Sequence, residues 1–241
     1  MILVVVNNMR NFFRLFVPLI INPYYYIKKI KKRSIKNFFN YDKKPYNRIS
    51  LISLAISKTI AKKGYDKCNY LEIGCFDNKA FDTIPLTLDQ KIGVDPLRGG
   101  THRMYSDDFF TNNKKFFDVI FIDGLHTYDQ CSKDVINSIN FLNKDGIIIL
   151  HDMLPRSKTE ETQEYSGDVW KVAYDLTKSQ NLDFIIANID QGVGLLKISD
   201  NSKYIKHDEI INKNFDNYKN DYYKDFPIKK IEDALTFIKS D

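Results

Sequence analysis

Two short runs of apolar residues, Val119–Ile122 and Ile147–Leu150, most strongly limit the folds open to this chain. Each run is apolar at every position, which is typical of central parallel strands covered on both faces. Between the runs, apolar side chains recur at helical spacing, at Tyr128, Cys131, Val135, Ile139 and Leu142. The segment 117–155 is therefore predicted to form one β-α-β unit of an α/β fold.

Ionisable residues follow both predicted strands directly. Asp123 and His126 come after the first strand, and His151 and Asp152 come after the second. In an open α/β sheet the carboxyl ends of parallel strands line the ligand crevice, so these four side chains are expected to converge on one site. The alternative for the two aspartates is a simple role as caps of the next turn or helix.

The composition fits one α/β domain with appendages. The chain has 241 residues, of which 43% are hydrophobic, enough for a sizeable core. It has three cysteines, Cys68, Cys75 and Cys131, an odd number without a CxxC pair. Neither a disulfide framework nor a structural zinc site is indicated, and a reducing, cytoplasmic setting fits best.

The basic charge lies in residues 1–48, the first of three predicted units. This segment holds seven Lys and four Arg against one Asp, a net charge of +10, which leaves −5 for the remainder. No basic stripe surrounds the predicted crevice, so a nucleic-acid-binding core is not expected. Arg14 and Pro18 interrupt the apolar stretch, which disfavours a spanning helix, and no cleavage site indicates a signal peptide. Two alternatives stay open for residues 1–36: peripheral contact with the inner face of a membrane, or packing on protein.

The remaining elements follow from periodicity and turn residues. Helices are predicted over 49–62 and over 81–88, and a further short helix is predicted to begin near Asp107. A closing helix is also predicted, with an apolar face made of Ile228, Ile231, Leu235 and Ile238. The further predicted strands are 69–73, 91–94, 183–189 and 193–198. Only three residues join the last two strands, and because a parallel crossover needs a dozen or more, this pair must be an antiparallel hairpin. Residues 201–241 are predicted as a polar tail with a closing helix.

A tight-turn motif follows the first predicted strand, reading Glu72-Ile73-Gly74-Cys75-Phe76-Asp77-Asn78. Asn78 stands where a second glycine is usual, and Asn tolerates left-handed geometry better than most residues. With the strand-end acids and the hairpin, the motif resembles class I S-adenosylmethionine-dependent methyltransferases over residues 65–200. The similarity is greatest to the methyltransferase 24-like family of catechol-type and sugar- or antibiotic-modifying O-methyltransferases. It implies a Rossmann-like, doubly wound, mostly parallel seven-stranded sheet with a C-terminal antiparallel hairpin, over residues 49–200.

The resemblance also implies where S-adenosylmethionine would bind. The cofactor-binding residues it indicates are Glu72, Gly74, Cys75, Phe76, Asn78, Asp95, Ser106, Asp107 and Asp123. Asp95 ends a strand where an acidic side chain can accept hydrogen bonds from ribose hydroxyls. Ser106 and Asp107 match positions that contact adenine, and their alternative is an ordinary helix N-cap.

The catalytic assignments also rest on the family. Metal-dependent members hold a divalent cation with residues that match Asp123, His151 and Asp152. Because imidazole is a softer ligand than carboxylate, Mn²⁺ is expected as readily as Mg²⁺, and a metal-independent reaction is the alternative. His126 matches a basic catalytic residue and, with Asp123, is predicted to remove a proton from the acceptor.

The sequence therefore predicts an O-methyltransferase acting on a small hydroxylated acceptor, such as a sugar or nucleotide sugar in glycan or secondary-metabolite biosynthesis. One alternative is a methyltransferase-like binding module without catalysis. Another is an NAD-dependent dehydrogenase or epimerase, although no GxGxxG fingerprint is present. Trp170, the only Trp, is predicted to anchor its helix, with acceptor stacking as the alternative. A homo-oligomer is left open.

Overall fold

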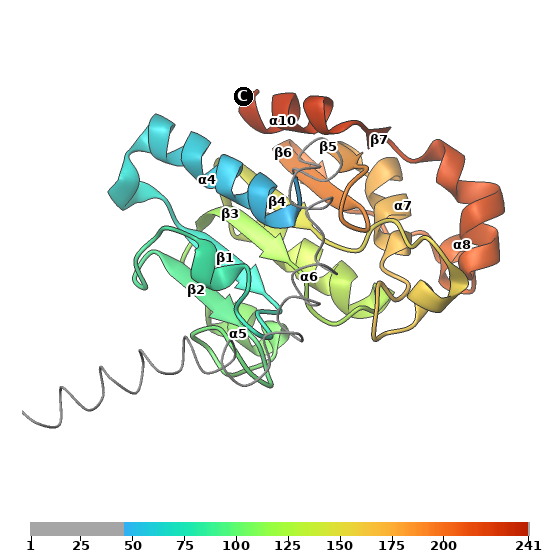
Figure 1. Cartoon of the computed structure of the whole chain (residues 1–241), viewed down its shortest axis with the longest axis horizontal. Helices are drawn as coiled ribbons and strands as arrows, with labels where there is room; N and C mark the ends of the chain where they lie inside the picture. The colour runs from blue at the N-terminus through green and yellow to red at the C-terminus, as the bar shows by residue number, and fades with distance from the viewer. Residues whose placement is uncertain (1–45, 241) are drawn as a thin grey trace, which may run out of the picture. The chain divides into compact units, whose positions relative to one another are not determined.

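Seven strands form one mixed sheet in the computed structural model, which describes residues 46–240 (Figure 1). The strands are β1 (Tyr70–Ile73), β2 (Lys91–Val94), β3 (Phe117–Ile122), β4 (Leu142–Leu150), β5 (Gln180–Ala187), β6 (Val193–Lys203) and β7 (Ile228–Lys229). Their order is β2-β1-β3-β4-β6-β5-β7, with β1 to β4 parallel. β6 is antiparallel to β4 and β5, and β7 is parallel to β5. The predicted fold class, including the C-terminal hairpin, is confirmed.

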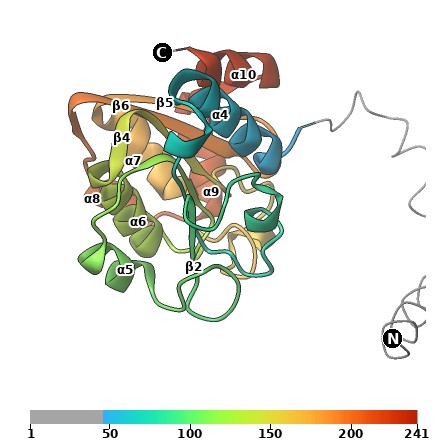
Figure 2. The ribbon, with the colours of Figure 1, turned by 90° about the vertical axis from the view of Figure 1, so that its left-hand side faces the viewer.

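Helices cover both faces of this sheet (Figure 2). The α-helices are α4 (Arg48–Lys63), α5 (Ser106–Asn112), α6 (Tyr128–Asn140), α7 (Trp170–Lys178), α8 (Asp208–Ile211), α9 (Phe215–Asn217) and α10 (Ile231–Lys239). Short 3₁₀ or π turns lie at η1 (Tyr65–Lys67), η2 (Phe81–Thr83), η3 (Lys158–Glu161), η4 (Tyr218–Tyr222) and η5 (Tyr223–Asp225). Buried residues of α4 and α10 pack on one face of the sheet, and those of α5, α6 and α7 pack on the other.

The strand register aligns the carboxyl ends of the central strands. Ile73, the last residue of β1, pairs with Val94 of β2 on one side and with Ile122 of β3 on the other. Ile122 in turn pairs with Leu150, which ends β4. The residues that follow these strand ends therefore lie side by side at one edge of the sheet, and they include the predicted site residues.

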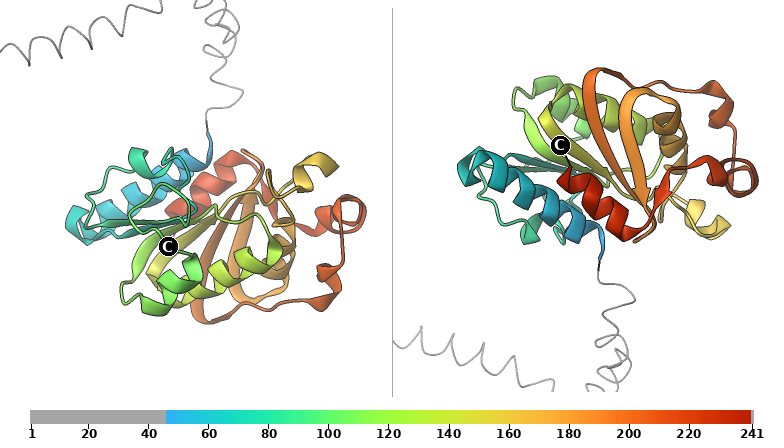
Figure 3. Two further views of the ribbon diagram at one scale, coloured as in Figure 1. Left: turned by 90° about the horizontal axis from the view of Figure 1, so that it is seen from below. Right: turned by 90° about the horizontal axis from the view of Figure 1, so that it is seen from above.

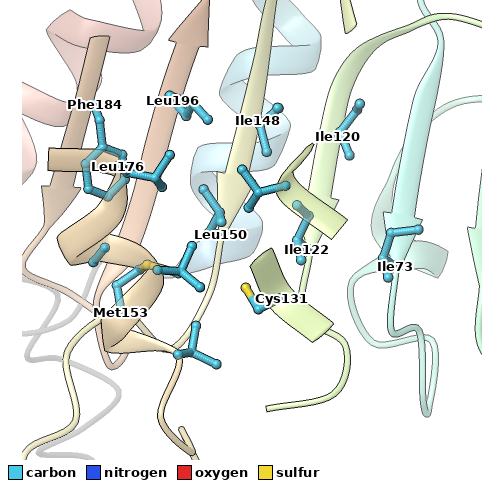
Figure 4. Packing of buried hydrophobic residues seen from close by; sticks show 14 of the residues in the cluster. Ile73, Ile120, Ile122, Cys131, Ile148, Leu150, Met153, Leu176, Phe184 and Leu196 are labelled. Atoms are coloured by element: carbon cyan, nitrogen blue, oxygen red, sulfur yellow. The ribbon is translucent and has the colours of Figure 1, made fainter. Parts of the chain in front are cut away.

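The core below this edge is made of aliphatic side chains from neighbouring strands. Ile73, Ile122 and Leu150 lie in one row across β1, β3 and β4, and Cys131 of α6 lies near them (Figure 4). Each is at most 4% exposed, and burial of such side chains contributes roughly 1.5–3 kcal/mol apiece. The site residues are therefore attached to the most firmly packed part of the sheet.

One predicted helix is largely missing. Residues 81–88 form only η2, and residue 84 already has extended backbone angles. Pro85 explains the early end, because the residue before a proline is disfavoured in helical geometry and proline has no N–H to donate. Lys91 reinforces the turn, since its ammonium donates to the carbonyls of Phe81 and Ile84.

The C-terminal residues are part of the same packing unit as the sheet. β6 continues to Lys203, across the predicted boundary at residue 200, and β7 adds an edge strand beside β5. Ile228 belongs to β7, so the closing helix α10 begins later than predicted, at Ile231. α10 lies beside α4 on one face of the sheet (Figure 3).

The predicted N-terminal segment falls largely outside the described residues, with only residues 46–48 inside them. The expectations of membrane contact or protein packing through residues 1–36 thus concern residues outside the described range. Within residues 46–240, no helix is long and apolar enough to cross a membrane.

Candidate functional site

The turn after β1 has the tight geometry that the motif predicts. Gly74 has φ +86°, and a Cβ at this position would lie 2.0 Å from the carbonyl oxygen of Asp123. Only glycine allows the two chain segments to approach so closely. Asn78 has φ +60° and accepts a hydrogen bond from the backbone N–H of Gly100 at 2.7 Å through its side-chain oxygen. Asn78 therefore adopts the left-handed conformation and adds a bond that a glycine could not make.

Two other residues of this motif, Glu72 and Cys75, are buried in the protein. Glu72 is 1% exposed, and its carboxylate accepts a 2.6 Å hydrogen bond from the Tyr70 hydroxyl. Burial raises the pKa of Glu72 to about 7, against the opposing effect of this hydrogen bond. Burial also raises the pKa of the Cys75 thiol, so the thiol is inert. Phe76 is 55% exposed, and the guanidinium of Arg98 lies 3.6 Å from its ring centroid.

Asp95 connects the turns that follow β1 and β2. One carboxylate oxygen accepts from the backbone N–H of Phe76 at 2.9 Å. The other accepts from the N–H groups of Leu97 and Arg98, both at 2.8 Å. A carboxylate has about four acceptor sites, so capacity for a further donor remains on the first oxygen. Asp95 therefore directly follows its strand and fixes the loops after β1 and β2.

Ser106 and Asp107 begin α5, but neither side chain caps it. The N-cap residue is Tyr105, which makes no side-chain capping bond. The Gln130 amide of α6 instead donates to the Ser106 hydroxyl at 3.1 Å and to the Asp107 carboxylate at 3.2 Å. The N-cap alternative therefore does not describe these side chains, which form a polar link between α5 and α6.

The four ionisable residues after β3 and β4 form one cluster. His126 Nε2 lies 3.6 Å from Asp123 Oδ1 and 3.3 Å from Asp152 Oδ2. His151 Nδ1 lies 3.2 Å from each of the same two oxygens. Asp152 has φ +63°, a left-handed geometry in which its carboxylate meets both imidazoles. The two acids thus stand between two histidines, as their positions at aligned strand ends predicted.

The electrostatics of the cluster follow from these distances. Burial disfavours the charged form of His151, yet the nearby Asp123 outweighs it and raises the pKa of His151 well above its usual value. Burial likewise opposes ionisation of Asp123, but the charge of His151 and hydrogen bonds from both histidines hold its pKa well below the usual range. The pKa of His126 is raised, because its bond to Asp123 and the charge of Asp152 outweigh the effect of burial.

Three residues of the site were not predicted from the sequence. Ser166, which is fully buried, donates to Asp152 Oδ1 at 3.1 Å. Arg48 is at the start of α4, and its Nε lies 3.4 Å from Asp123 Oδ2. The Oδ2 atom of Asp190 lies 3.8 Å from His151 Nε2. The sequence offered a faint signal only for Asp190, which stands in the short turn of the predicted hairpin at the same sheet edge as the strand ends.

Three side chains of the cluster could hold a cation. Asp123, His126 and Asp152 offer ligand atoms that all lie within 4.8 Å of one another. His151 Nδ1 lies between the two carboxylates, and its Nε2 lies 3.4 Å from Arg48 Nη1 and 3.8 Å from Asp190 Oδ2. Two carboxylates and one imidazole suit Mn²⁺ or another transition ion as well as Mg²⁺. The residues present therefore fit a divalent cation, and this group shares Asp123 and Asp152 with the predicted ligands.

Trp170 has the structural role favoured from the sequence. It is fully buried, its ring packs on Tyr218 at a centroid distance of 5.1 Å, and its indole N–H donates to Glu161 at 3.1 Å. A fully buried ring offers no stacking surface for an acceptor, so Trp170 anchors α7 to the sheet.

Residues 59–153 match a family model described as a methyltransferase domain. Over this range the chain is similar to methyltransferases. The match runs from α4 through the end of β4 and contains all of the predicted site residues, whereas Arg48, Ser166 and Asp190 lie outside it. The match agrees with the predicted family and enzyme class. No curated protein matches the sequence.

Several solved methyltransferases are similar in structure. One is a Podospora anserina methyltransferase bound to SAH, with 14% identity, a TM-score of 0.43, and coverage of 62% of this chain and 78% of that one. An O-methyltransferase from Bacillus cereus has 12% identity and a TM-score of 0.47, covering 68% and 85%. The O-methyltransferase TomG from Streptomyces achromogenes has 12% identity and a TM-score of 0.42, covering 69% and 96%. These likenesses assign no residue and no acceptor to this chain.

Proposed function

We propose that this methyltransferase modifies a hydroxyl oxygen of a small acceptor, with His126 as the base. The observation that carries the proposal is the close approach of Gly74 to the backbone of Asp123. It brings the cofactor turn directly against the acid-imidazole cluster. S-adenosylmethionine, when bound, supplies a methyl group on a positively charged sulfur. A donor turn and a proton acceptor that share one sheet edge are what transfer to a hydroxyl requires.

The geometry of His126 defines its role in the step. Nε2 faces the carboxylates of Asp123 and Asp152, at 3.6 and 3.3 Å. Nδ1 is then the nitrogen that can take a proton, and the carboxylates hold the ring in this tautomer. The acceptor oxygen forms its bond to the methyl carbon as the carbon–sulfur bond breaks, and the hydroxyl proton moves to Nδ1.

Binding and transfer are tested separately. Calorimetry of the full chain with S-adenosylmethionine should give saturable heat, because the turn, Asp95 and the α5–α6 link are all in place. Label from [methyl-³H]S-adenosylmethionine should then appear on a hydroxylated compound in a panel of catechols, free sugars and nucleotide sugars. Binding without transfer to any panel member would favour the binding module over the enzyme, and no heat from a folded chain would contradict the whole proposal. The sugar acceptor remains a hypothesis that the panel decides.

Metal assistance is a second candidate, favoured by the Asp123, His126 and Asp152 donor set. A bound divalent cation would lower the pKa of the acceptor hydroxyl. If it is needed, excess EDTA abolishes methyl transfer, and added Mn²⁺ or Mg²⁺ restores it. Full activity in EDTA would instead leave proton removal to His126 alone and assign both carboxylates to its orientation.

A further inference from the structure

Arg48 and Asp190 form an ion pair behind the proposed catalytic cluster. The Arg48 backbone N–H donates to Asp190 Oδ2 at 3.1 Å, and its Nη1 donates to the same oxygen at 2.9 Å. Arg48 is the first residue of α4, while Asp190 lies in the turn between β5 and β6. Residues more than 140 positions apart thus meet beside the cluster, and the matched methyltransferase region contains neither.

Arg48 also faces the catalytic acid. Its Nε lies 3.4 Å from Asp123 Oδ2, is buried, and makes no hydrogen bond within residues 46–240. Asp123 Oδ1, the other oxygen, already faces His126 and His151. The two oxygens of Asp123 are therefore divided between the histidines and the guanidinium, which restricts rotation of the carboxylate.

Asp190 faces the outer edge of His151. Its Oδ2 lies 3.8 Å from Nε2, whereas Nδ1 of the same ring lies between Asp123 and Asp152. The turn that carries Asp190 is rigid, since a Cβ on Gly192 would lie 2.5 Å from Leu154 and the Met153 N–H donates to the Gly192 carbonyl. The outer nitrogen of His151 is thus approached both by Asp190 and by Nη1 of Arg48, which lies 3.4 Å from Nε2.

We propose that Arg48 and Asp190 are positioning residues, which hold the Asp123 carboxylate and the His151 ring so that Asp123 and Asp152 meet His126. Neither residue needs to touch cofactor or acceptor for this role. The kinetic part of the proposal rests on the proposed function, but the orientation of the His151 ring does not. A readout of the ring therefore tests the proposal even if no methyl transfer is found.

The chain provides a matched control at the other end of α4. Lys63, the last residue of this helix, makes a 2.6 Å ion pair with Asp118 of β3. Like Arg48, it joins α4 to an acid of the β3 segment, but it does so at the opposite end of the strand from Asp123. Loss of either pair removes one tie between helix and sheet, and only loss of Arg48 disturbs the cluster.

The experiment compares full-length wild type with Arg48→Met, Arg48→Lys, Asp190→Asn and Lys63→Met, each labelled with ¹⁵N-histidine. We expect Arg48→Met and Asp190→Asn to shift the ring ¹⁵N signals of His151, and Arg48→Lys, which keeps the charge, to shift them less. Where transfer is measurable, kcat should fall by about 10–100-fold in the first two variants, the usual loss for a supporting partner, while the KM for S-adenosylmethionine stays within about twofold. Lys63→Met should lower Tm but leave the ring signals and kcat unchanged.

Two results would overturn the inference. One is an unshifted His151 ring in Arg48→Met and Asp190→Asn, which would show that the pair only joins α4 to the turn. The other is an equal effect of Lys63→Met on ring signals or kcat, which would show that general loss of stability is the cause. A wild type without methyl transfer counts against the proposed function, and the ring signals then decide this inference by themselves.

Discussion

His126 is the residue on which the proposed chemistry depends most directly. Its pKa is raised, mainly because Asp123 and Asp152 outweigh the effect of burial. A base must be neutral to take a proton, so the rate should rise with pH along a limb centred above the ordinary histidine value of about 6.5.

His126→Ala should lower kcat by about a hundredfold to ten-thousandfold and remove this limb. Cofactor affinity should hardly change, since the cofactor turn is held by Gly74, Asn78 and Asp95. The measurements are a pH–rate profile and calorimetry on the same preparation. Wild-type turnover with an unchanged profile would remove His126 from the mechanism, and rescue by added Mn²⁺ would point to metal ligation.

Asp95→Ala should weaken S-adenosylmethionine binding by roughly 1.5–3 kcal/mol for each charge-assisted hydrogen bond to the ribose that the substitution removes. The structure gives a second reason for weaker binding, because Asp95 also accepts three backbone N–H groups that fix the neighbouring loops. Calorimetry measures the affinity, and a Tm taken alongside separates loosening of the loops from the missing ribose hydrogen bonds. Unchanged affinity would leave Asp95 as a strand terminator only.

At the scale of elements, the cofactor turn depends on one close approach between chain segments. Gly74 and Gly64 both have positive φ, +86° and +92°, but a Cβ would meet backbone only at Gly74 and nothing within 4 Å at Gly64. Comparing the two alanine variants therefore separates the clash from the cost of the backbone geometry itself.

Gly64→Ala should cost about 1–3 kcal/mol of stability and leave cofactor affinity intact. Gly74→Ala should cost more and abolish S-adenosylmethionine binding, because the turn has to move away from Asp123. Chemical denaturation and calorimetry give the two quantities. Normal cofactor affinity in Gly74→Ala would contradict the proposed dependence of the cofactor turn on its close approach to the cluster.

At the scale of the whole molecule, the C-terminal residues are needed for the packing of α7. Asp175 of α7 is fully buried and accepts from the Tyr204 hydroxyl at 2.8 Å and from the His207 N–H at 3.1 Å. Tyr218, also fully buried, packs on Trp170. Its hydroxyl makes no hydrogen bond within the described residues, so packing of the ring alone accounts for the contribution of Tyr218 to the free energy of unfolding.

Tyr218→Ala should therefore lower the free energy of unfolding by about 3–5 kcal/mol and shift the emission of Trp170 to longer wavelength. Tyr218→Phe is the matched control, and it should be neutral or slightly stabilising, since the hydroxyl that it removes has no partner among residues 46–240. Fluorescence-detected denaturation measures both quantities. Equal stability of the alanine variant and wild type would show that the C-terminal residues merely lie on a core complete without them.

The sequence by itself determined the architecture and the sheet edge at which the four ionisable residues converge. Periodicity identified β3 and β4 as buried parallel strands, the three-residue turn required a hairpin, and acids at strand ends marked the crevice edge. These are local properties, because burial on both faces, turn length and left-handed tolerance each depend on a few neighbouring residues. Pro85 was an equally local signal, and its effect on the predicted 81–88 helix was underestimated.

Only the tertiary structure decided which residues share the site. Periodicity cannot show that Arg48 and Asp190 meet, because their proximity depends on how α4 packs on the sheet and how the hairpin returns beside β4. The surroundings of the two histidines were decided in the same way, since ring orientation follows from the charged groups around each ring and not from spacing along the chain. Charged residues that are far apart in the sequence interact when the fold brings them close together, and the register of β1, β3 and β4 determines how close they lie.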